Sequence, residues 1–410
     1  AGAWCGQNKY LSAIKNAFQN FMPLTIAGAI GVLWCNVLVN DQTGLGLFFK
    51  PIMALDFLNP AFQAVNFCTI SCITVGITLG IAQEIGVWNM GAEKAGYIPG
   101  LVGLAAWLSV TNTSHMVEGA KEAFTGIAGN ELGATGLFTG MIIGVLSVEL
   151  FCFFEKQDAL KIKMPEQVPP GVARAFEVLV PATITLIITA CIGSACYNLT
   201  GLYLNDVIKN GIQGPLGAVG ATIPGVMIIY LVIMLFWLVG IHGNNMLSAV
   251  KEALFTPLAL ENVEKFNKGE KPTNIINMYA LQMWGEFGGS GVTIGLVIAI
   301  MIFGKREDNK AIATLSLVPG LFNINETVTF GIPMVLNPIL GIPFVFACLV
   351  TILVGYVLTV IGFCPVACLT VPWTTPPIVF GFLACGANVM GAVTQAILIV
   401  VSTVIYVPFL

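Results

Sequence analysis

The last hundred residues of the chain, from Ala311 to Leu410, contain one charged side chain, Glu326, and no histidine or lysine. Sequence this apolar is suited to lipid, where roughly 20 consecutive apolar residues cross the hydrocarbon core as a helix. The whole chain has 57% hydrophobic and 9% charged residues, whereas soluble domains carry about 25% charged residues. The sequence therefore predicts an all-α polytopic membrane protein.

Apolar runs along the chain predict about ten transmembrane helices, with weaker or broken segments between the clear ones. The clear runs are residues 21–39, 61–83, 97–111, 134–154, 176–197, 217–240, 288–304, 343–363 and 389–409.

The distribution of lysine and arginine predicts part of the topology. Lys156, Lys161 and Lys163 follow the fourth run, which indicates a cytoplasmic loop and a cytoplasmic N-terminus. The basic groups within 265–271 and 305–310 also favour the cytoplasm, although only the run 288–304 clearly separates them. Either one group is misplaced or the segment 274–287 makes a further crossing.

Three apolar segments in the second half are interrupted by Gly, Pro, Asn and Thr: 274–287, 311–338 and 366–386. Non-helical backbone at membrane depth is tolerated only where it is buried in protein or lines a cavity. Discontinuous helices are therefore a sequence indicator of a transport site, and the site is expected in the C-terminal half.

Two ionisable residues fall in interrupted sequence of this half. Glu326 lies in Phe-Asn-Ile-Asn-Glu-Thr, and a carboxylate at membrane depth usually faces a cavity or a substrate path. The alternative is a loop carboxylate at the water interface. His242 ends an apolar run within Gly-Ile-His-Gly-Asn-Asn, where glycine allows close approach of backbone and ligand, although a histidine there is commonly a satisfied interfacial residue. Together they are predicted to form an acid/base or hydrogen-bonding pair.

Trp237 and Trp373 lie beside these interruptions. Aromatic faces pack on the apolar face of a sugar ring, while the alternative for each tryptophan is an anchor at the membrane interface. Other chemistries have no support: a GxxxxGK[ST] phosphate loop is missing, and the eleven cysteines form no CxxC pair. Neither a metal nor a cofactor is predicted, and no basic stripe suggests nucleic acid.

Four motifs occur in an order that resembles a known family. They are Lys161-Ile-Lys-Met-Pro-Glu-Gln-Val-Pro-Pro-Gly-Val-Ala-Arg-Ala-Phe176, Gly240-Ile-His-Gly243, Asn325-Glu326 leading into Phe330-Gly-Ile-Pro-Met-Val-Leu-Asn-Pro338, and Val371-Pro-Trp-Thr-Thr-Pro-Pro377. The chain resembles the IIC membrane component of the bacterial phosphoenolpyruvate-dependent sugar phosphotransferase system, in its lactose/cellobiose/diacetylchitobiose branch.

The resemblance implies a homodimer in the bacterial inner membrane, with two re-entrant hairpins in the C-terminal half. Residues 1–154, with 176–200, would form the dimer-forming half. Residues 155–175 would be a cytoplasmic amphipathic linker, and 201–410 the sugar-binding transport half.

The resemblance also implies a β-linked disaccharide substrate, phosphorylated by a IIB partner that carries phosphocysteine, with IIA upstream. Diacetylchitobiose, cellobiose and lactose all stay open. The cysteines here lack a polar Gly/Ser-rich loop, so IIA and IIB are expected to be separate polypeptides. The alternative function is a proton-coupled secondary sugar transporter.

The family motifs assign roles to residues. His242 and Glu326 match the essential histidine and glutamate, and Glu326 is either a general base or an orienting ligand. One departure is Thr327, where the family motif has proline after Asn-Glu. The predicted sugar-binding residues are Asn325, Trp237, Trp373, Gly243, Asn244 and Thr374.

Overall fold

The computed structural model describes residues 8–41, 45–115, 124–165, 167–215, 220–332, 334 and 337–410. The regular secondary structure within them is helical, apart from a two-stranded antiparallel sheet of β1 (Ser114–His115) and β2 (Phe124–Thr125). Six helices in the described part are long and apolar enough to cross a membrane, or seven with a bent pair included. The prediction of an all-α membrane protein is confirmed, and the number of ten crossings stays a prediction.

The chain divides into two compact units, and each is described by itself. The N-terminal unit comprises Gln7–Leu24 and Thr69–Leu216, and the C-terminal unit comprises Thr25–Cys68 and Gly217–Leu410, where the structure describes them. The N-terminal unit contains the start of α2 (Lys9–Leu33), α4 (Ile73–Met90), α5 (Ala92–Ala95), α6 (Ile98–Val110), α7 (Gly129–Leu132), α8 (Leu137–Glu155), α9 (Pro170–Thr200) and α10 (Leu204–Ile208).

The C-terminal unit contains the rest of α2 and the later helices. These are α3 (Asn59–Cys68), α12 (Ile223–Leu238), α13 (Gly243–Asn267), α14 (Met278–Gly285), α15 (Ile294–Phe303), α16 (Glu307–Leu321), α17 (Glu326–Gly331), α18 (Pro338–Val360), α19 (Val379–Ala384) and α20 (Val389–Tyr406). Short 3₁₀ or π turns join or extend several of them: η1 (Trp34–Leu38), η2 (Leu45–Leu47), η3 (Lys50–Leu58), η4 (Asp158–Leu160), η5 (Lys209–Gln213), η6 (Ser290–Val292) and η7 (Val407–Phe409).

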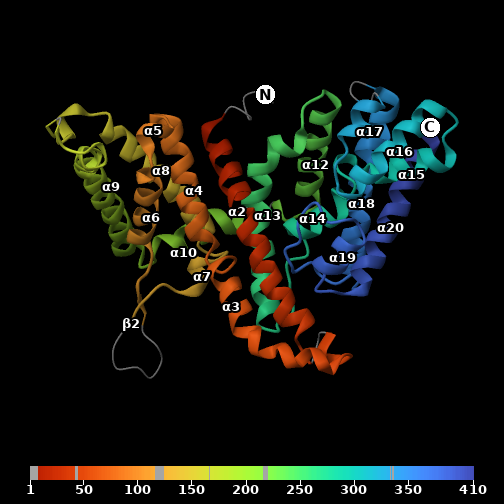
Figure 1. The fold of residues 1–410 in the computed structure, drawn as a ribbon, viewed down its shortest axis with the longest axis horizontal. Coiled ribbons are helices and arrows are strands. Elements are labelled where there is room, and N and C mark those ends of the chain that lie inside the picture. Colours follow the sequence, from red (N-terminus) through yellow and green to blue (C-terminus); the bar gives the residue numbers. More distant parts are fainter. Residues whose placement is uncertain are drawn as a thin grey trace. The chain divides into compact units, whose positions relative to one another are not determined.

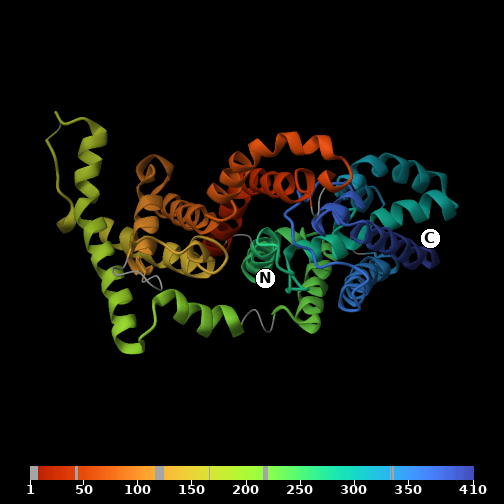
Figure 2. The same ribbon diagram turned by 90° about the horizontal axis from the view of Figure 1, so that it is seen from below.

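The core of the N-terminal unit is a bundle in which α4, α6 and α8 lie side by side, with α9 against α6 and α8 (Figures 1 and 2). Glycines allow this close packing. A Cβ at Gly103 of α6 would lie 2.3 Å from the Cβ of Ala82, and one at Gly140 of α8 would lie 2.2 Å from Thr78 Oγ1. Small residues let membrane helices approach closely where lipid provides no hydrophobic driving force.

Helix α2 begins at Lys9, well before the predicted start at residue 21. Polar partners within the N-terminal unit explain the difference. Lys9 Nζ lies 2.6 Å from Glu149 Oε1, and Asn16 Nδ2 donates to Glu84 Oε2 at 2.9 Å. Hydropathy alone leaves these polar residues out of the predicted helix. In the structure, neighbouring carboxylates pair with the charge of Lys9 and with the amide of Asn16.

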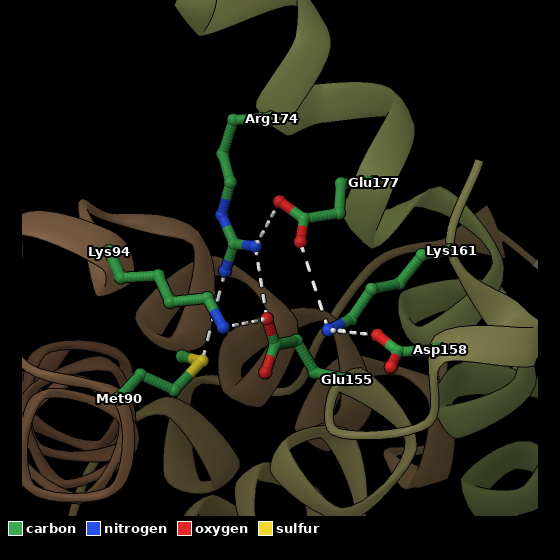
Figure 3. A network of polar contacts seen from close by, with 7 residues as sticks. All are labelled: Met90, Lys94, Glu155, Asp158, Lys161, Arg174 and Glu177. Atoms are coloured by element: carbon green, nitrogen blue, oxygen red, sulfur yellow. Dashed lines mark hydrogen bonds and ion pairs between the residues drawn. The ribbon is translucent and has the colours of Figure 1, made fainter. Parts of the chain in front are cut away.

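The connection between α8 and α9 is held by an ion-pair network (Figure 3). The Glu155 carboxylate, at the end of α8, is only 1% exposed and contacts Lys94 Nζ at 2.8 Å and Arg174 Nη1 at 3.0 Å. Arg174, in the first turns of α9, also contacts Glu177 at 2.7 Å. The linker predicted at residues 155–175 therefore begins and ends on one paired cluster.

In the C-terminal unit, the segment Met278–Val292, which contains α14 and η6, and the helix α15 form a pair bent by 57°. Helix was predicted from residue 288, but α15 begins only at Ile294. The intervening Gly288, Gly289 and Gly291 have φ of 69°, 87° and 75°, a left-handed conformation that interrupts a helix and that glycine adopts at low cost. The apolarity of this run correctly indicated membrane sequence, while its glycines end the helix.

The two units do not follow the predicted halves. Residues 25–68 group with the C-terminal unit, whose later part starts at residue 217 rather than 201. One contact that places them there is the bond from Asn36 Nδ2 to Asn267 Oδ1 of α13, at 3.2 Å. The division of labour between a dimer-forming and a sugar-binding half stays a prediction.

Candidate functional site

His242 lies at the start of α13, directly after the turn that ends α12. Gly240 in this turn has a φ of 80°. The His242 Nδ1 atom accepts a hydrogen bond from the Asn245 backbone N–H at 3.3 Å, so the imidazole caps its own helix. With Nδ1 occupied as an acceptor, the neutral ring carries its proton on Nε2.

The free Nε2 atom faces Glu326. It lies 3.9 Å from Glu326 Oε1, and the side chains are 38% and 47% exposed. This separation is longer than a direct hydrogen bond. An oxygen atom placed about 2.8 Å from each would have an angle of about 90° between the two contacts, which a hydroxyl can accommodate. The predicted pair is therefore brought together, at a separation that one shared hydroxyl oxygen would bridge.

Glu326 is the first residue of α17 rather than a loop residue, and Asn325 directly before it is buried. The Asn325 Nδ2 atom donates to the Ser290 carbonyl at 2.9 Å. The Glu326 carboxylate is thus half-exposed, while the buried Asn325 next to it holds the backbone in place.

Trp237 packs against His242, with ring centroids 4.4 Å apart and planes inclined by 49°. It is 2% exposed, so its face supports the imidazole. Its Nε1 atom has no hydrogen-bond partner among the residues that the structure describes. The predicted sugar contact of Trp237 stays a prediction, since both its ring and this N–H group are buried.

Trp373 and Thr374 are exposed, and their segment is fixed through its backbone. Asn323 Nδ2 donates to the carbonyls of Trp373 and of Thr375, the latter at 3.0 Å. The Asn323 side chain also accepts from the Gly288 N–H at 2.6 Å. Asn323 therefore ties the tryptophan segment to the sequence that leads into Glu326.

The glycine after His242 serves packing. A Cβ at Gly243 would lie 2.0 Å from the Ile233 carbonyl oxygen, so the missing side chain accommodates α12. The following Asn244 donates from Nδ2 to Ser290 Oγ at 2.9 Å. Both residues have partners within the protein, and their predicted contact with sugar stays a prediction.

Sequence reasoning missed a buried polar cluster next to this pair. Lys251 of α13 forms an ion pair with Glu286, which also accepts from Tyr230 Oη at 2.6 Å. Lys251 Nζ contacts Asn244 Oδ1 at 3.4 Å. Two signals point to the cluster: Glu286 is the only charged residue between Lys271 and Lys305, and Lys251 follows Asn244 by seven residues, two turns along one helix face.

A metal centre has no candidate ligands in the described part of the chain, where no group of three or more His, Cys, Asp or Glu side chains gathers. The site consists of a half-exposed imidazole and carboxylate, the buried amide of Asn325 and the partly buried amide of Asn244 beside them, and an exposed tryptophan on a tethered segment. Side chains of these types can donate hydrogen bonds to hydroxyl groups and accept hydrogen bonds from them.

Apolar membrane helices, broken segments and this polar site define a polytopic membrane transport protein. Residues 15–348 match the family described as "Phosphotransferase system, EIIC". The chain therefore belongs to the phosphotransferase system EIIC family, whose members are integral inner-membrane components of sugar phosphotransferase systems and act with a IIB partner.

Individual relatives agree with this assignment. The chain is 34% identical to the oligo-beta-mannoside-specific EIIC component of Bacillus subtilis (strain 168), covering 98% of this chain and 89% of that protein. It is 29% identical to the cellobiose-specific EIIC component of Lactococcus lactis subsp. lactis (strain IL1403), covering 98% and 94%. The crystal structure of ChbC, the IIC component of the N,N'-diacetylchitobiose-specific system, matches with a TM-score of 0.90 and 30% identity, covering 99% and 94%. The family resemblance and the inner-membrane location are confirmed.

Proposed function

We propose that this permease carries a β-linked disaccharide across the inner membrane and presents it for phosphorylation by phosphocysteine on IIB. The observation that carries the proposal is the separation of 3.9 Å between His242 Nε2 and Glu326 Oε1, both half-exposed. A sugar hydroxyl between them has an acceptor and a donor within reach. Positioning of this kind is the main requirement of phosphoryl transfer.

In the proposed reaction the bond between the IIB cysteine sulfur and phosphorus breaks while a bond forms between the sugar hydroxyl oxygen and phosphorus. The hydroxyl proton leaves toward Glu326, which is either its general base or the acceptor that orients it. The His242 Nε2–H donates to the same or a neighbouring hydroxyl, or to the phosphoryl oxygens as their charge develops. The cysteine leaves as the free thiolate of IIB.

The β-linked disaccharide follows from two kinds of support. Relatives are named for oligo-β-mannoside, cellobiose and diacetylchitobiose. The exposed ring of Trp373, held by its backbone, is available to stack on a sugar face. We further propose that the permease works as a homodimer, with the sugar bound in the C-terminal unit.

The test measures transport of radiolabelled diacetylchitobiose, cellobiose or lactose into proteoliposomes that contain this chain. The vesicles are compared with and without phosphorylated IIB. Phosphosugar inside the vesicles only with phospho-IIB supports the proposal and names the sugar. Uptake of unmodified sugar that follows an imposed proton gradient and ignores IIB would contradict it, and would favour the secondary transporter.

A further inference from the structure

The residues that flank the candidate pair both bind one residue, Ser290. Asn244, two positions after His242, donates from Nδ2 to Ser290 Oγ at 2.9 Å. Asn325, directly before Glu326, donates from Nδ2 to the Ser290 carbonyl at 2.9 Å. Ser290 is 3% exposed. Two segments that lie more than eighty residues apart in sequence therefore meet at its side chain and its backbone.

This convergence matters because His242 and Glu326 have no direct hydrogen bond to hold them. Their side chains face each other at 3.9 Å, so the separation depends on the backbones that carry them. Two hydrogen bonds to Ser290, one from the Asn244 side chain and one from the Asn325 side chain, link the segments that carry them. A shift of about 1 Å between reacting groups is enough to reduce a rate roughly 100-fold.

The loop around Ser290 is shaped for this role. Gly289 before it and Gly291 after it have φ of 87° and 75°, and Val292 has a φ of 49°. A Cβ at Gly289 would lie 2.6 Å from the Asn325 Cβ. The glycine therefore allows the Asn325 side chain to reach the Ser290 carbonyl.

A buried ion pair orients the side chain of Asn244, the other residue that binds Ser290. Lys251 contacts both Glu286 and Asn244 Oδ1, and Glu286 is also bound by Tyr230. An ammonium group only donates, so the amide oxygen of Asn244 faces Lys251 and its NH₂ group faces Ser290. The ion pair thereby sets the direction of the Asn244 bond to Ser290.

We propose that Ser290 is a positioning residue that sets the separation of His242 and Glu326 through Asn244 and Asn325, and that the Lys251–Glu286 pair orients Asn244 for this purpose. The inference deepens the proposed function and rests on it for its kinetic consequences. Its geometric consequence, the placement of His242 beside Glu326, is measurable without substrate or IIB.

The kinetic test compares Ser290→Ala with Ser316→Ala in the full chain with phospho-IIB. Ser316 is the matched control because it is equally buried and its Oγ bonds only within its own helix, to Ile312 O. Ser290→Ala should lower the rate constant of phosphosugar formation about 10- to 100-fold, while sugar affinity and thermal stability change little. Ser316→Ala should match the wild type. Equal rates for the two variants, or a loss in Ser290→Ala that follows its stability, would overturn the proposal.

A second pair of variants separates orientation from folding. Lys251→Met leaves Glu286 without its cation and should unfold more readily, whereas the double variant Lys251→Met/Glu286→Gln removes both charges and should recover stability. The proposal expects the double variant to remain slow in phosphosugar formation, since Asn244 has lost its ammonium partner. Recovery of wild-type rate together with stability would show that the ion pair acts only structurally.

The substrate-independent test uses isotope-labelled histidine, since His115 and His242 are the only histidines. In NMR spectra of the full chain in detergent, Ser290→Ala should shift the ring signals of His242 and leave those of His115 in place. Unchanged His242 signals would overturn the proposal. If the wild-type chain yields no phosphosugar, the proposed function fails, and this spectrum still decides the role of Ser290.

Discussion

The two units differ in how a key carboxylate is buried and paired. In the N-terminal unit, Glu155 is buried and contacts two cations, Lys94 and Arg174 (Figure 3). In the C-terminal unit, Glu326 is half-exposed, and its nearest described ionisable neighbour, His242, stands 3.9 Å away. The first arrangement satisfies a carboxylate inside the protein, and the second leaves a carboxylate available to bind something else.

The difference has a physical basis. A buried charge is tolerated when it is paired and hydrogen-bonded, and a second cation makes the pairing redundant. A carboxylate that is left without a strong internal partner keeps its capacity to accept a hydroxyl proton or hydrogen bond. The Lys251–Glu286 pair lies between these extremes, because it is buried but has one cation for one carboxylate.

The largest expected effect is at the unpaired carboxylate. Glu326→Gln should lower phosphosugar formation with phospho-IIB by about 10²–10⁴-fold, the usual contribution of a general base, while sugar affinity stays within a modest factor. Glu307→Gln is the control, since Glu307 also begins a helix in the same unit but pairs with Lys310. Intact phosphorylation in Glu326→Gln would exclude the general-base role.

Stability should depend most on the Lys251–Glu286 pair, in which one carboxylate has one cation. Lys251→Met leaves the Glu286 carboxylate without its cation and should lower the free energy of unfolding by roughly 3–5 kcal/mol, measured by thermal or denaturant unfolding in detergent. Lys268→Met, directly after the end of the same helix, removes an exposed lysine paired with Glu264 and should have no measurable effect. Similar stability in both variants would contradict the distinction between buried and exposed pairs.

The redundant network should tolerate the loss of one cation better. In Arg174→Met the Glu155 carboxylate keeps Lys94, so the expected cost is about 1.5–3 kcal/mol for the lost charged hydrogen bonds. Removing Lys94 as well should cost more than the two single changes added together. Strict additivity would show that the two cations act independently of each other.

The smallest expected effect concerns the exposed tryptophan. Trp373→Ala should weaken sugar affinity by roughly 1–3 kcal/mol if its ring stacks on the sugar, as measured by calorimetry. Trp88→Ala is the control, since Trp88 is also exposed but lies in the N-terminal unit. Unchanged affinity in Trp373→Ala would make this residue a structural anchor.

Much of the fold could be predicted because lipid imposes a strong and local requirement. The apolar run at 134–154 matches α8 closely, and the run at 176–197 lies within α9, which begins earlier, at Pro170, since a spanning helix needs an uninterrupted apolar length. The start of α2 and the late start of α15 could not be predicted in this way. The first depends on carboxylates brought from other helices, and the second on backbone angles at three glycines.

The sequence by itself determined that this is a helical membrane protein, and the rarity of charge in its last hundred residues singled out Glu326, with His242 as its partner. Only the tertiary structure decided that these two side chains face each other, and that Lys251, Glu286 and Ser290 stand behind them. The reason is physical: hydropathy is a property of each segment, whereas a polar site is formed by contacts between segments far apart in the chain.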